Sequence, residues 1–403
     1  MKTKTWEINK LEEVCEILDN KRVPISSKNR IRGIYPYYGA SGIVDYIDKY
    51  IFDEELVLIG EDGAKWGAFE NSAFIAEGKY WVNNHAHILK PNNEILINKF
   101  LVYFLNYSNL EKYITGATVK KLNQQKLKQI EIPLPPLEEQ MRIVKILDLA
   151  FEKIDTSVEL LKANLANLDE LAKSVLDRAF NPLGDSTEST QNPSTHDTQS
   201  PYPLPQHWEW KSLGEIANTS SGGTPSRNKK EYWENGNIKW LKSGELNDGY
   251  IDFIEENITE EAIKNSSAKI FQKGTLLIAM YGATAGKLGI LNLDSTTNQA
   301  ICAFLHKDKN IKFLEKFLFY FLFFLRDKII KDSFGGAQPN INQTYIKNLQ
   351  IPLPPIKEQE QIAKHLDFVF EKTKALKELY TKELKDYEEL KQSLLNKAFK
   401  GEL

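Results

Sequence analysis

Apolar residues recur at alternating steps of four and three along two segments of the chain. The first stripe begins at Leu147 and ends at Ala179, and the second begins at Leu366 and ends at Ala398. A 3.5-residue spacing keeps one narrow stripe of a helix against a partner helix, so it predicts two coiled-coil helices. Each would run for about 40 residues, or roughly 60 Å at 1.5 Å per residue. The seam positions are Leu147, Phe151, Ile154, Val158, Leu161, Leu165, Leu168, Ala172, Val175 and Ala179, and then Leu366, Phe370, Thr373, Lys377, Tyr380, Leu384, Tyr387, Lys391, Leu394 and Ala398.

Two lysines, Lys377 and Lys391, interrupt the second stripe. Leu376, Leu379 and Leu390 lie beside these gaps, and we expect them to take over the contact. The simplest arrangement buries each apolar seam against the other. A pseudo-two-fold axis would then set the helices antiparallel, with one interior domain near each end. The alternative is two separate coiled coils that bind other proteins.

The segments that carry the stripes are copies of each other. Ile132 to Phe180 recurs without a gap as Ile351 to Phe399, with 23 of 49 aligned positions identical. The start Trp6-Glu7 is echoed by Trp208-Glu209. The interiors between these anchors show no comparable match, and the second interior is the longer of the two. A fixed frame around two different interiors indicates one scaffold with two different reading surfaces, whereas the alternative is two repeats with equal roles.

The interiors are expected to be mixed α/β domains. Short β-rich runs at 56–60 and 275–280 are bounded by turn residues, and amphipathic helices at 97–107 and 311–324 close each interior. Ser, Thr and Pro dominate 181–205, which predicts a polar linker. The fold class is therefore α+β, with two mixed domains separated by two long antiparallel helices. The expected boundaries are 1–137 and 206–356 for the domains, 138–180 and 357–403 for the helices, and 181–205 for the linker.

Composition narrows the class of protein. The chain has 403 residues, 41% hydrophobic and 27% charged, without an apolar run of membrane-spanning length, and its start is charged where a signal peptide is apolar. We expect a soluble cytoplasmic protein. Cys15 and Cys302 lack metal-binding or disulfide spacing and are expected to be reduced and buried.

Local charge differs from the overall net charge of −3. Residues 1–130 carry 18 basic and 16 acidic side chains, and 206–350 again carry 18 and 16, so each interior is +2. Basic clusters at 28–32 and 227–230 lie near aromatic residues, a composition suited to phosphate contacts and base readout. The alternative is solvated loop charge.

Three motifs resemble catalytic, metal-binding or nucleotide-binding sites. Asp62, Glu77 and Lys79 imitate the carboxylate and lysine array of a metal-dependent nuclease, but the second repeat has no counterpart. The run Asn83 to His87 could offer two metal ligands on one strand face, yet a third ligand is not evident nearby, and a polar strand or a groove contact is favoured. Gly282 to Lys287 resembles a phosphate loop but departs from the motif at two positions, so it is not a nucleotide site.

The frame resembles the specificity subunit of type I restriction-modification systems. The resemblance lies in the twin Ile-Pro-Leu-Pro-Pro-x-x-Glu-Gln segments with their heptad tails and covers essentially the whole chain apart from the linker. Further matching stretches are Pro203 to Trp210, Gly222 to Ser226, Asn298 to Ala300, Tyr35 to Gly42 and Gly60 to Gly63.

The resemblance implies a non-catalytic subunit. In the family, two target-recognition domains each read one half of a split double-stranded DNA target, and the two helices hold them apart and dock two methylation subunits. Helices of roughly 60 Å are just under two turns of B-DNA at about 34 to 36 Å each, so both domains could address one face of a duplex. The resemblance also implies that S-adenosylmethionine, ATP and Mg²⁺ are bound by methylation and restriction subunits, with no cofactor or metal in this chain.

Contacts with DNA bases are predicted in loops of both interiors from residue type and expected loop position. The alternatives are a stand-alone DNA-binding nuclease that uses Asp62, Glu77 and Lys79, and a coiled-coil scaffold that does not bind DNA. The predicted DNA-binding residues are Lys28, Arg30, Tyr37, Tyr38, Ser41, Lys65, Asn84 and His85 in the first domain, and Thr224, Ser226, Arg227, Lys242, Ser243, Tyr281, Lys287, Asn298 and Gln299 in the second.

Overall fold

A computed structural model describes residues 6–184, 202–307, 312–333 and 340–403. The chain forms two compact units, the first made of Met1–Ala163 and Leu379–Leu403 and the second of Asn164–Glu378. Each unit contains one interior and part of both long helices. Most of the expected linker at 181–205 lies outside the described residues. Among the described helices, none has the length and apolar content of a membrane span.

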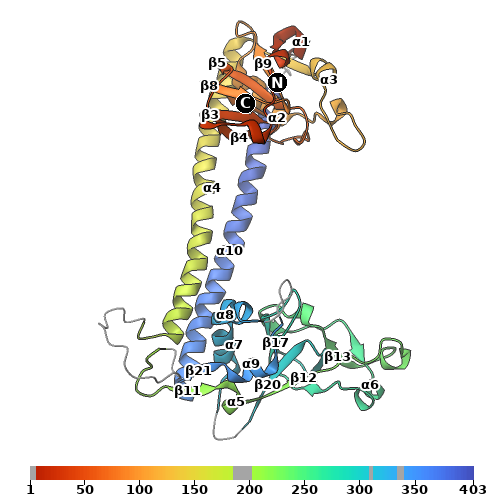
Figure 1. Ribbon diagram of the computed structural model, residues 1–403, viewed down its shortest axis with the longest axis vertical. Coiled ribbons are helices and arrows are strands. Elements are labelled where there is room, and N and C mark those ends of the chain that lie inside the picture. Colours follow the sequence, from red (N-terminus) through yellow and green to blue (C-terminus); the bar gives the residue numbers. More distant parts are fainter. Residues whose placement is uncertain (1–5, 185–201, 308–311, 334–339) are drawn as a thin grey trace. The chain divides into compact units, whose positions relative to one another are not determined.

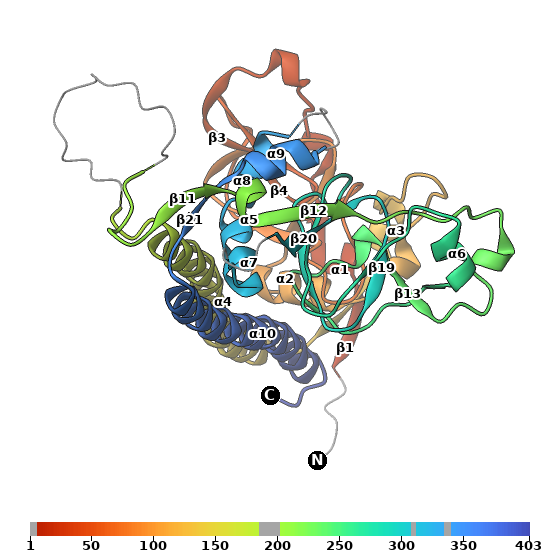
Figure 2. The same cartoon turned by 90° about the horizontal axis from the view of Figure 1, so that it is seen from below.

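Two helices of 44 residues each carry the heptad stripes, α4 (Leu137–Phe180) and α10 (Ile356–Phe399). They lie side by side in Figure 1 and Figure 2. Each begins directly after a Pro-Pro pair, where the restricted φ of proline favours a helix start, and Glu138, Glu139 and Glu358 supply carboxylates to the first turns.

The first unit is built around two four-stranded sheets. One has the order β2-β9-β6-β7 and is antiparallel, and the other has the order β4-β3-β8-β5, in which β3 and β8 are parallel. Every residue of β6 is buried, because α2 covers one face of its sheet and the second sheet covers the other. The elements are β2 (Cys15–Ile17), β3 (Arg32–Gly39), β4 (Gly42–Ile47), β5 (Phe52–Asp53), β6 (Leu56–Gly60), β7 (Ala73–Ala76), β8 (Lys79–Val82), β9 (Ala86–Pro91), α1 (Leu11–Val14), α2 (Asn98–Tyr107) and α3 (Gln124–Lys128).

The second unit repeats this plan with additions. Its sheets have the orders β12-β20-β17-β18-β14 and β15-β13-β19-β16, and β13 pairs with β19 in parallel as β3 pairs with β8. The expected helix at 311–324 is observed from Glu315, and position 311 is not described. The elements are β12 (Ala217–Ser221), β13 (Ile238–Leu241), β14 (Gly249–Ile251), β15 (Asn257–Ile258), β16 (Ile270–Phe271), β17 (Leu276–Ala279), β18 (Leu288–Leu291), β19 (Ser295–Thr297), β20 (Ile301–His306), α5 (Leu213–Ile216), α6 (Glu260–Lys264), α7 (Glu315–Phe324), α8 (Arg326–Lys331) and α9 (Gln343–Asn348).

The repeated frame has the same geometry in both units. Strand β1 (Glu7–Lys10) pairs with β10 (Glu131–Leu134), and β11 (Glu209–Ser212) pairs with β21 (Gln350–Leu353) in the same antiparallel register. A buried glutamine follows each time. Gln140 bonds Ile97 N, Ile95 O and Pro135 O at 2.8 to 3.0 Å. Gln359 bonds Leu314 N, Lys312 O and Pro354 O in the same way. The repeated Glu-Gln therefore fixes the start of each long helix to the segment before α2 or α7.

The far end of each long helix inserts into the other repeat. In the first unit, the Phe399 ring of α10 lies 5.4 Å from Phe104 and stacks at 4.9 Å on Tyr107 of α2. In the second, the Phe180 ring of α4 lies 5.4 Å from Phe317 and 5.3 Å from Phe321 of α7. The helices are thus antiparallel within each unit, and the expected fold class with its internal pseudo-two-fold repeat is confirmed.

Seam residues of both helices are buried, among them Leu161 of α4 and Leu366 of α10. The two seam lysines pair with aspartates of α4, Lys377 with Asp169 and Lys391 with Asp155. A lysine can lay its aliphatic stem along the seam while its ammonium group reaches a carboxylate at the edge.

The expectation that three neighbouring leucines replace these lysines is wrong. Leu376, Leu379 and Leu390 are 38%, 56% and 45% exposed. Because the lysines keep their seam positions, the leucines point away from the seam. Cys15 and Cys302 are buried and unpaired, as their spacing suggested.

Replacing Leu161 with Asp should destabilise the isolated chain by about 2 to 4 kcal/mol, because it places a charge in a contact that is 7% exposed. Denaturant unfolding of the purified chain measures this. The neighbouring Leu160 is 61% exposed, so Leu160→Asp is a matched control that should leave stability nearly unchanged. Equal unfolding midpoints for wild type and Leu161→Asp would contradict the intramolecular coiled coil.

Candidate nucleic-acid interface

Corresponding hydrogen bonds place matching loops at one edge of each unit. Asn83 N donates to Tyr38 O at 3.0 Å after β8, and Asn298 N donates to Leu241 O at 2.9 Å after β19. The carboxyl ends of parallel strands meet at the same edge, so the loop after β3 lies beside the loop after β8. The same holds for β13 and β19. Asn84 and Gln299 follow the matched asparagines and are both exposed.

A third loop joins this edge in each unit. Glu61 N donates to His85 O at 2.8 Å, and Met280 N donates to Ala300 O at 2.7 Å. The next residues form matching bridges, Asp62 with Lys121 and Tyr281 with Asn340. Asp62 and Tyr281 therefore occupy the same position on the scaffold with different chemistry.

In the first unit, several predicted contacts lie on these loops. Ser41 is exposed at the β3–β4 turn. The ring Nδ1 of His85 lies 2.6 Å from an Asp62 carboxylate oxygen, and both side chains are partly exposed. Lys65 lines a hollow of about 580 Å³ together with the loop from Gly116 to Lys120. Lys28 is exposed before β3, and no hydrogen bond to a described residue joins it to this edge.

Burial argues against two of the predicted base contacts in the first unit. Tyr37 is only 1% exposed, and its hydroxyl accepts a hydrogen bond from Ile25 N at 3.0 Å. This burial argues against its predicted base contact. Tyr38 packs edge-on against Tyr80 at 5.5 Å between the sheets, and burial raises its pKa. Successive strand residues point to opposite faces, so Tyr37 and Tyr38 pack into two different apolar clusters.

In the second unit, the structure brings the predicted residues into two groups. The Thr224 hydroxyl bonds the Gln299 side chain, and the Gln299 amide also bonds the Tyr281 hydroxyl. Burial raises the pKa of Tyr281 above its ordinary value, and the Gln299 hydrogen bond opposes this shift. Asn298 lies beside this group, and its side-chain oxygen is buried without a partner among the described residues.

The second group gathers around Glu256. Arg227 and Lys242 approach its two oxygens at 2.6 and 2.7 Å. Burial opposes ionisation of Glu256, but these two hydrogen bonds outweigh it and lower its pKa. Ser226 precedes Arg227, and Ser243 follows Lys242.

Lys287 is half-buried on the turn that precedes β18. None of its described hydrogen bonds joins it to either of the two groups of predicted residues in the second unit.

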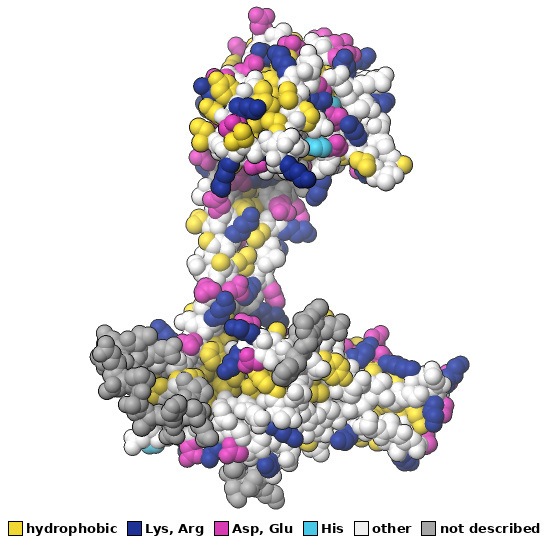
Figure 3. Space-filling model, viewed as in Figure 1, with side chains coloured by type: hydrophobic (Ala, Val, Ile, Leu, Met, Phe, Trp, Pro, Cys, Tyr) yellow, Lys and Arg dark blue, Asp and Glu magenta, His cyan; other side chains and the backbone are white. Residues whose placement is uncertain are grey.

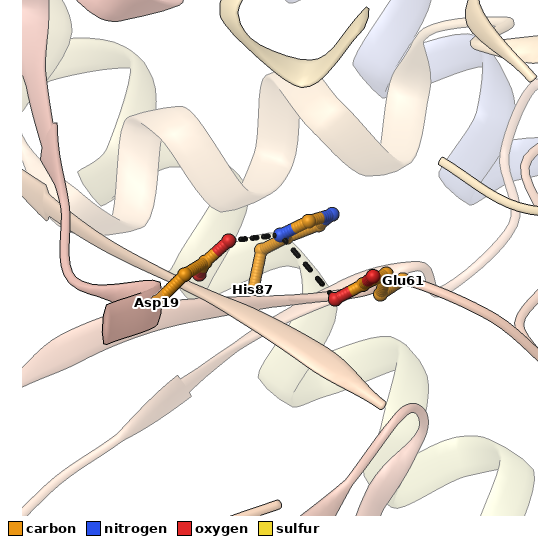
Figure 4. A group of neighbouring side chains, drawn as sticks. All are labelled: Asp19, Glu61 and His87. Atoms are coloured by element: carbon orange, nitrogen blue, oxygen red, sulfur yellow. Dashed lines mark hydrogen bonds and ion pairs between the residues drawn. The ribbon is translucent and has the colours of Figure 1, made fainter. Parts of the chain in front are cut away.

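A buried ion network supports the loops of the first unit. Figure 4 shows Asp19, Glu61 and His87 converging. The His87 Nδ1 atom lies 2.6 Å from Asp19 Oδ2, and its Nε2 atom lies 2.6 Å from Leu122 O. Each ring nitrogen of His87 therefore faces an oxygen atom.

The Glu61 carboxylate of this network is paired with two cations. Arg22 pairs with Glu61 and donates to Ala86 O at 2.9 Å, and Lys121 lies 2.7 Å from Glu61. Two cations beside the carboxylates make the cluster an ion network rather than an open metal site. At the corresponding places the second unit has Met280 and Cys302, which are neutral.

The expectation that His85 and His87 share a strand face is wrong. Strand β9 begins at Ala86, so His85 stands in the preceding turn and is exposed, whereas His87 is buried.

The positions of Asp62 and Glu77 do not give the geometry that the nuclease alternative requires. Strand β6 pairs with β7 so that Ile59 faces Ala73 and Leu56 faces Ala76. Asp62 follows one end of β6, and Glu77 lies beyond the other end, roughly 20 Å away at about 3.3 Å per residue. The two carboxylates cannot hold one metal ion.

Sequence reasoning missed residues that complete this edge. Asp62 and the loop from Gly116 to Lys120 were not among the predicted contacts, and Asn83 was considered only as part of a polar strand or groove contact. The dipeptides Asn83-Asn84 and Asn298-Gln299 are a signal that an alignment of the two interiors could have found, because each begins with the asparagine that follows the parallel strand.

Two matched loop edges on a duplicated helical frame define a protein with two recognition domains on one scaffold. The family described as the type I restriction modification DNA specificity domain matches residues 3–167 and 205–386, and the chain belongs to this family. Specificity subunits of these systems are non-catalytic, in agreement with the expected non-enzymatic role.

Similar proteins cover nearly the whole chain. A putative type I restriction enzyme specificity subunit, S.HindORF215P of Haemophilus influenzae, is 31% identical over 377 residues, which cover 89% of this chain and 86% of that protein. The MjaVIII specificity subunit of Methanocaldococcus jannaschii is 25% identical, with 99% and 93% covered. A chain in a solved structure on complex assembly and conformational transition of the type I R-M system is 21% identical, covers 99% of both chains and has a TM-score of 0.69, which shows the same fold.

Lowering the pH should destabilise the first unit before the second. In Asp19 and Glu61 burial opposes ionisation, but His87, Lys121 and Arg22 outweigh it, so both pKa values lie below their ordinary range. A carboxyl whose pKa is lower in the folded state adds stability that is present at neutral pH and lost as pH falls through the folded pKa. Hydrogen exchange below about pH 4 should therefore rise in β6 and β9 before it rises in β17 and β20.

The matched control for this pH dependence is Asp19→Asn, which removes one of the titrating groups. Exchange in β6 and β9 of this variant should already be raised at neutral pH and should change less on acidification. Simultaneous loss of protection in both units of the wild-type chain would contradict the role of the network.

Proposed function

We propose that this chain selects the DNA target of a type I restriction-modification complex. Each unit reads one half of a split duplex target, and the long helices dock methylation subunits, to which restriction subunits are added. The observation that carries the proposal is one loop edge built twice with different side chains. Asp62 and Asn84 stand in the first unit where Tyr281 and Gln299 stand in the second.

The chemistry of these edges suits base recognition. Amides such as Asn84 and Gln299 both donate and accept hydrogen bonds, which lets them match the edge of a base pair in the major groove. Different side chains on one scaffold would read different sequences. Two such edges in one chain would give a target of two unlike halves.

Exposed apolar residues on the long helices support docking of partner subunits. Leu149, Leu160 and Leu171 of α4 are evenly spaced along the helix and are 52%, 61% and 47% exposed. Their spacing is close to three helical turns at about 3.6 residues per turn, so these side chains share one face of the helix. Figure 3 shows apolar side chains among charged ones on the surface of the long helices.

The same stripe occurs on α10. Phe368, Leu379 and Leu390 are 60%, 56% and 45% exposed and occupy the positions of the second repeat that align with the three leucines of α4. Solvent exposure of such regularly placed large apolar residues is typical of a binding surface. Two equivalent stripes fit two copies of one partner.

The proposal assigns the reactive cofactors to the partners. Methylation subunits would bind S-adenosylmethionine, and restriction subunits would use ATP and Mg²⁺. This chain would supply the position on DNA at which they act. Its site of action would be the cytoplasm.

A map of adenine methylation in cells tests the proposal. Cells that express this chain with its neighbouring methylation subunit should gain a methylated motif of two short halves around an unspecified spacer. Cells that express the methylation subunit alone are the control and should lack it. The same methylation pattern in both would contradict the proposal, and Mg²⁺-dependent cleavage by the isolated chain that is abolished by Glu77→Ala would support the nuclease instead.

Replacing Leu160 with Glu should remove one copy of the methylation subunit from the complex, because it charges one of the two stripes. Replacing Leu160 and Leu379 together should remove both copies. Lys162→Glu is a control on the same helix, about 200° around its axis. Native mass spectrometry gives the stoichiometry, and two bound copies in the double variant would rule out docking on these stripes.

A further inference from the structure

An arginine, an aromatic ring and a carboxylate form a compact group in the first unit. The Arg30 guanidinium carbon lies 4.4 Å above the Tyr37 ring. Arg30 Nη1 donates to Asp45 Oδ2 at 3.1 Å, and Nε donates to Ile25 O at 3.1 Å. Asp45 also accepts from Tyr46 N at 2.9 Å, which together with Arg30 lowers its pKa. The Arg30 side chain is therefore held at three points while remaining 22% exposed.

The second unit contains the same group in different sequence. The Arg227 guanidinium carbon lies 4.8 Å from the Trp240 ring and 3.7 Å from the Trp233 ring. Its Nη1 atom lies 2.6 Å from Glu256 Oε2. The arginine side chain is 51% exposed.

Strand pairing places the two groups at the same point of the scaffold. Tyr37 pairs with Trp81 across the parallel β3–β8 ladder, as Trp240 pairs with Thr296 across β13–β19. Asp45 stands opposite Tyr37 on the antiparallel neighbour β4. Glu256 stands opposite Trp240 directly before β15, and its carbonyl accepts from Trp240 N at 2.9 Å. We call each group a clamp, made of Arg30, Tyr37 and Asp45 in one unit and Arg227, Trp240 and Glu256 in the other.

We propose that Arg30 and Arg227 contact DNA phosphates rather than base edges, and that Asp45 and Glu256 are positioning residues for them. The inference rests on the proposed function. The clamp is shared by two domains whose neighbouring loops differ, so it serves what two different half-sites have in common. That common feature is the sugar-phosphate backbone, since base edges differ between the halves.

Each part of the clamp has a physical role. The ring and the carboxylate fix the guanidinium plane before DNA arrives, so less side-chain entropy is lost on binding. The other nitrogen, Nη2 of Arg30, bonds no described residue and can donate to a phosphate oxygen. The carboxylate also repels DNA, so positioning and simple charge predict opposite signs when the carboxylate is removed.

The experiment measures binding of the full chain to a labelled mixed-sequence duplex at salt concentrations from about 50 to about 200 mM. Arg30→Ala should weaken binding and flatten the slope of log affinity against log salt by about 1, as expected for one lost phosphate contact. Asp45→Ala should weaken binding by about threefold to tenfold although it removes a negative charge. Asp45→Asn keeps an acceptor oxygen and should fall between Asp45→Ala and wild type.

Asp48→Ala is the matched control, because Asp48 follows the same strand and its carboxylate pairs with no described residue. It should bind DNA as tightly as wild type or more tightly. In the second unit Glu256→Gln should weaken binding, whereas the adjacent Glu255→Gln should not. Arg30→Lys keeps the charge but cannot lie flat on the ring with the same hydrogen bonds, so it should also weaken binding in a chain whose melting temperature is unchanged.

The methylated motif gives a second readout. Arg30→Ala and Arg227→Ala should each lower the extent of methylation without changing the bases of the motif. A changed base preference would make the arginine a base reader and overturn the inference. Asp45→Ala binding as tightly as Asp48→Ala would overturn the positioning role. Failure of the wild-type chain to bind any duplex would instead refute the proposed function.

Discussion

The structure depends on the exchange of helix ends between the two repeats. Phe180 of α4 lies in the aromatic cluster of α7, and Phe399 of α10 lies in that of α2. Each long helix begins in its own repeat, held by Gln140 or Gln359, and ends in the core of the other. Each core therefore includes side chains from the end of the other repeat's long helix.

A fixed frame leaves the loop edges free to differ. Backbone bonds such as Asn83 N to Tyr38 O and Asn298 N to Leu241 O hold the loops in place without reference to the side chains around them. Backbone hydrogen bonds tolerate sequence change because every residue except proline carries the same donor and acceptor. The scaffold can therefore keep its geometry while residues such as Asp62 and Tyr281 define two different surfaces.

The helices, the repeat and the mixed interiors could be predicted because they follow from periodicity and sequence identity. Side-chain placement inside the interiors could not. Tyr37 is buried by its parallel pairing with β8, and that pairing joins two segments that are distant in the sequence. The clamp could not be predicted for the same reason, because only the register of the strands brings Asp45 and Glu256 to their arginines. The Lys391 and Asp155 pair likewise depends on helix packing rather than on either sequence alone.

The two interiors differ in their buried residues as well as in their exposed loops. The first unit supports its loops with Glu61 and His87 in a buried ion network, whereas the second has Met280 and Cys302 at those places. A buried charge network stabilises a domain only when all its members are satisfied, so a change in one of them alone lowers stability. Exchange of the exposed loop residues between the units would leave these supports unmatched. A new DNA preference is therefore expected to come from replacement of a whole interior within the constant frame, because the frame contacts it through the strands and helices that both repeats share.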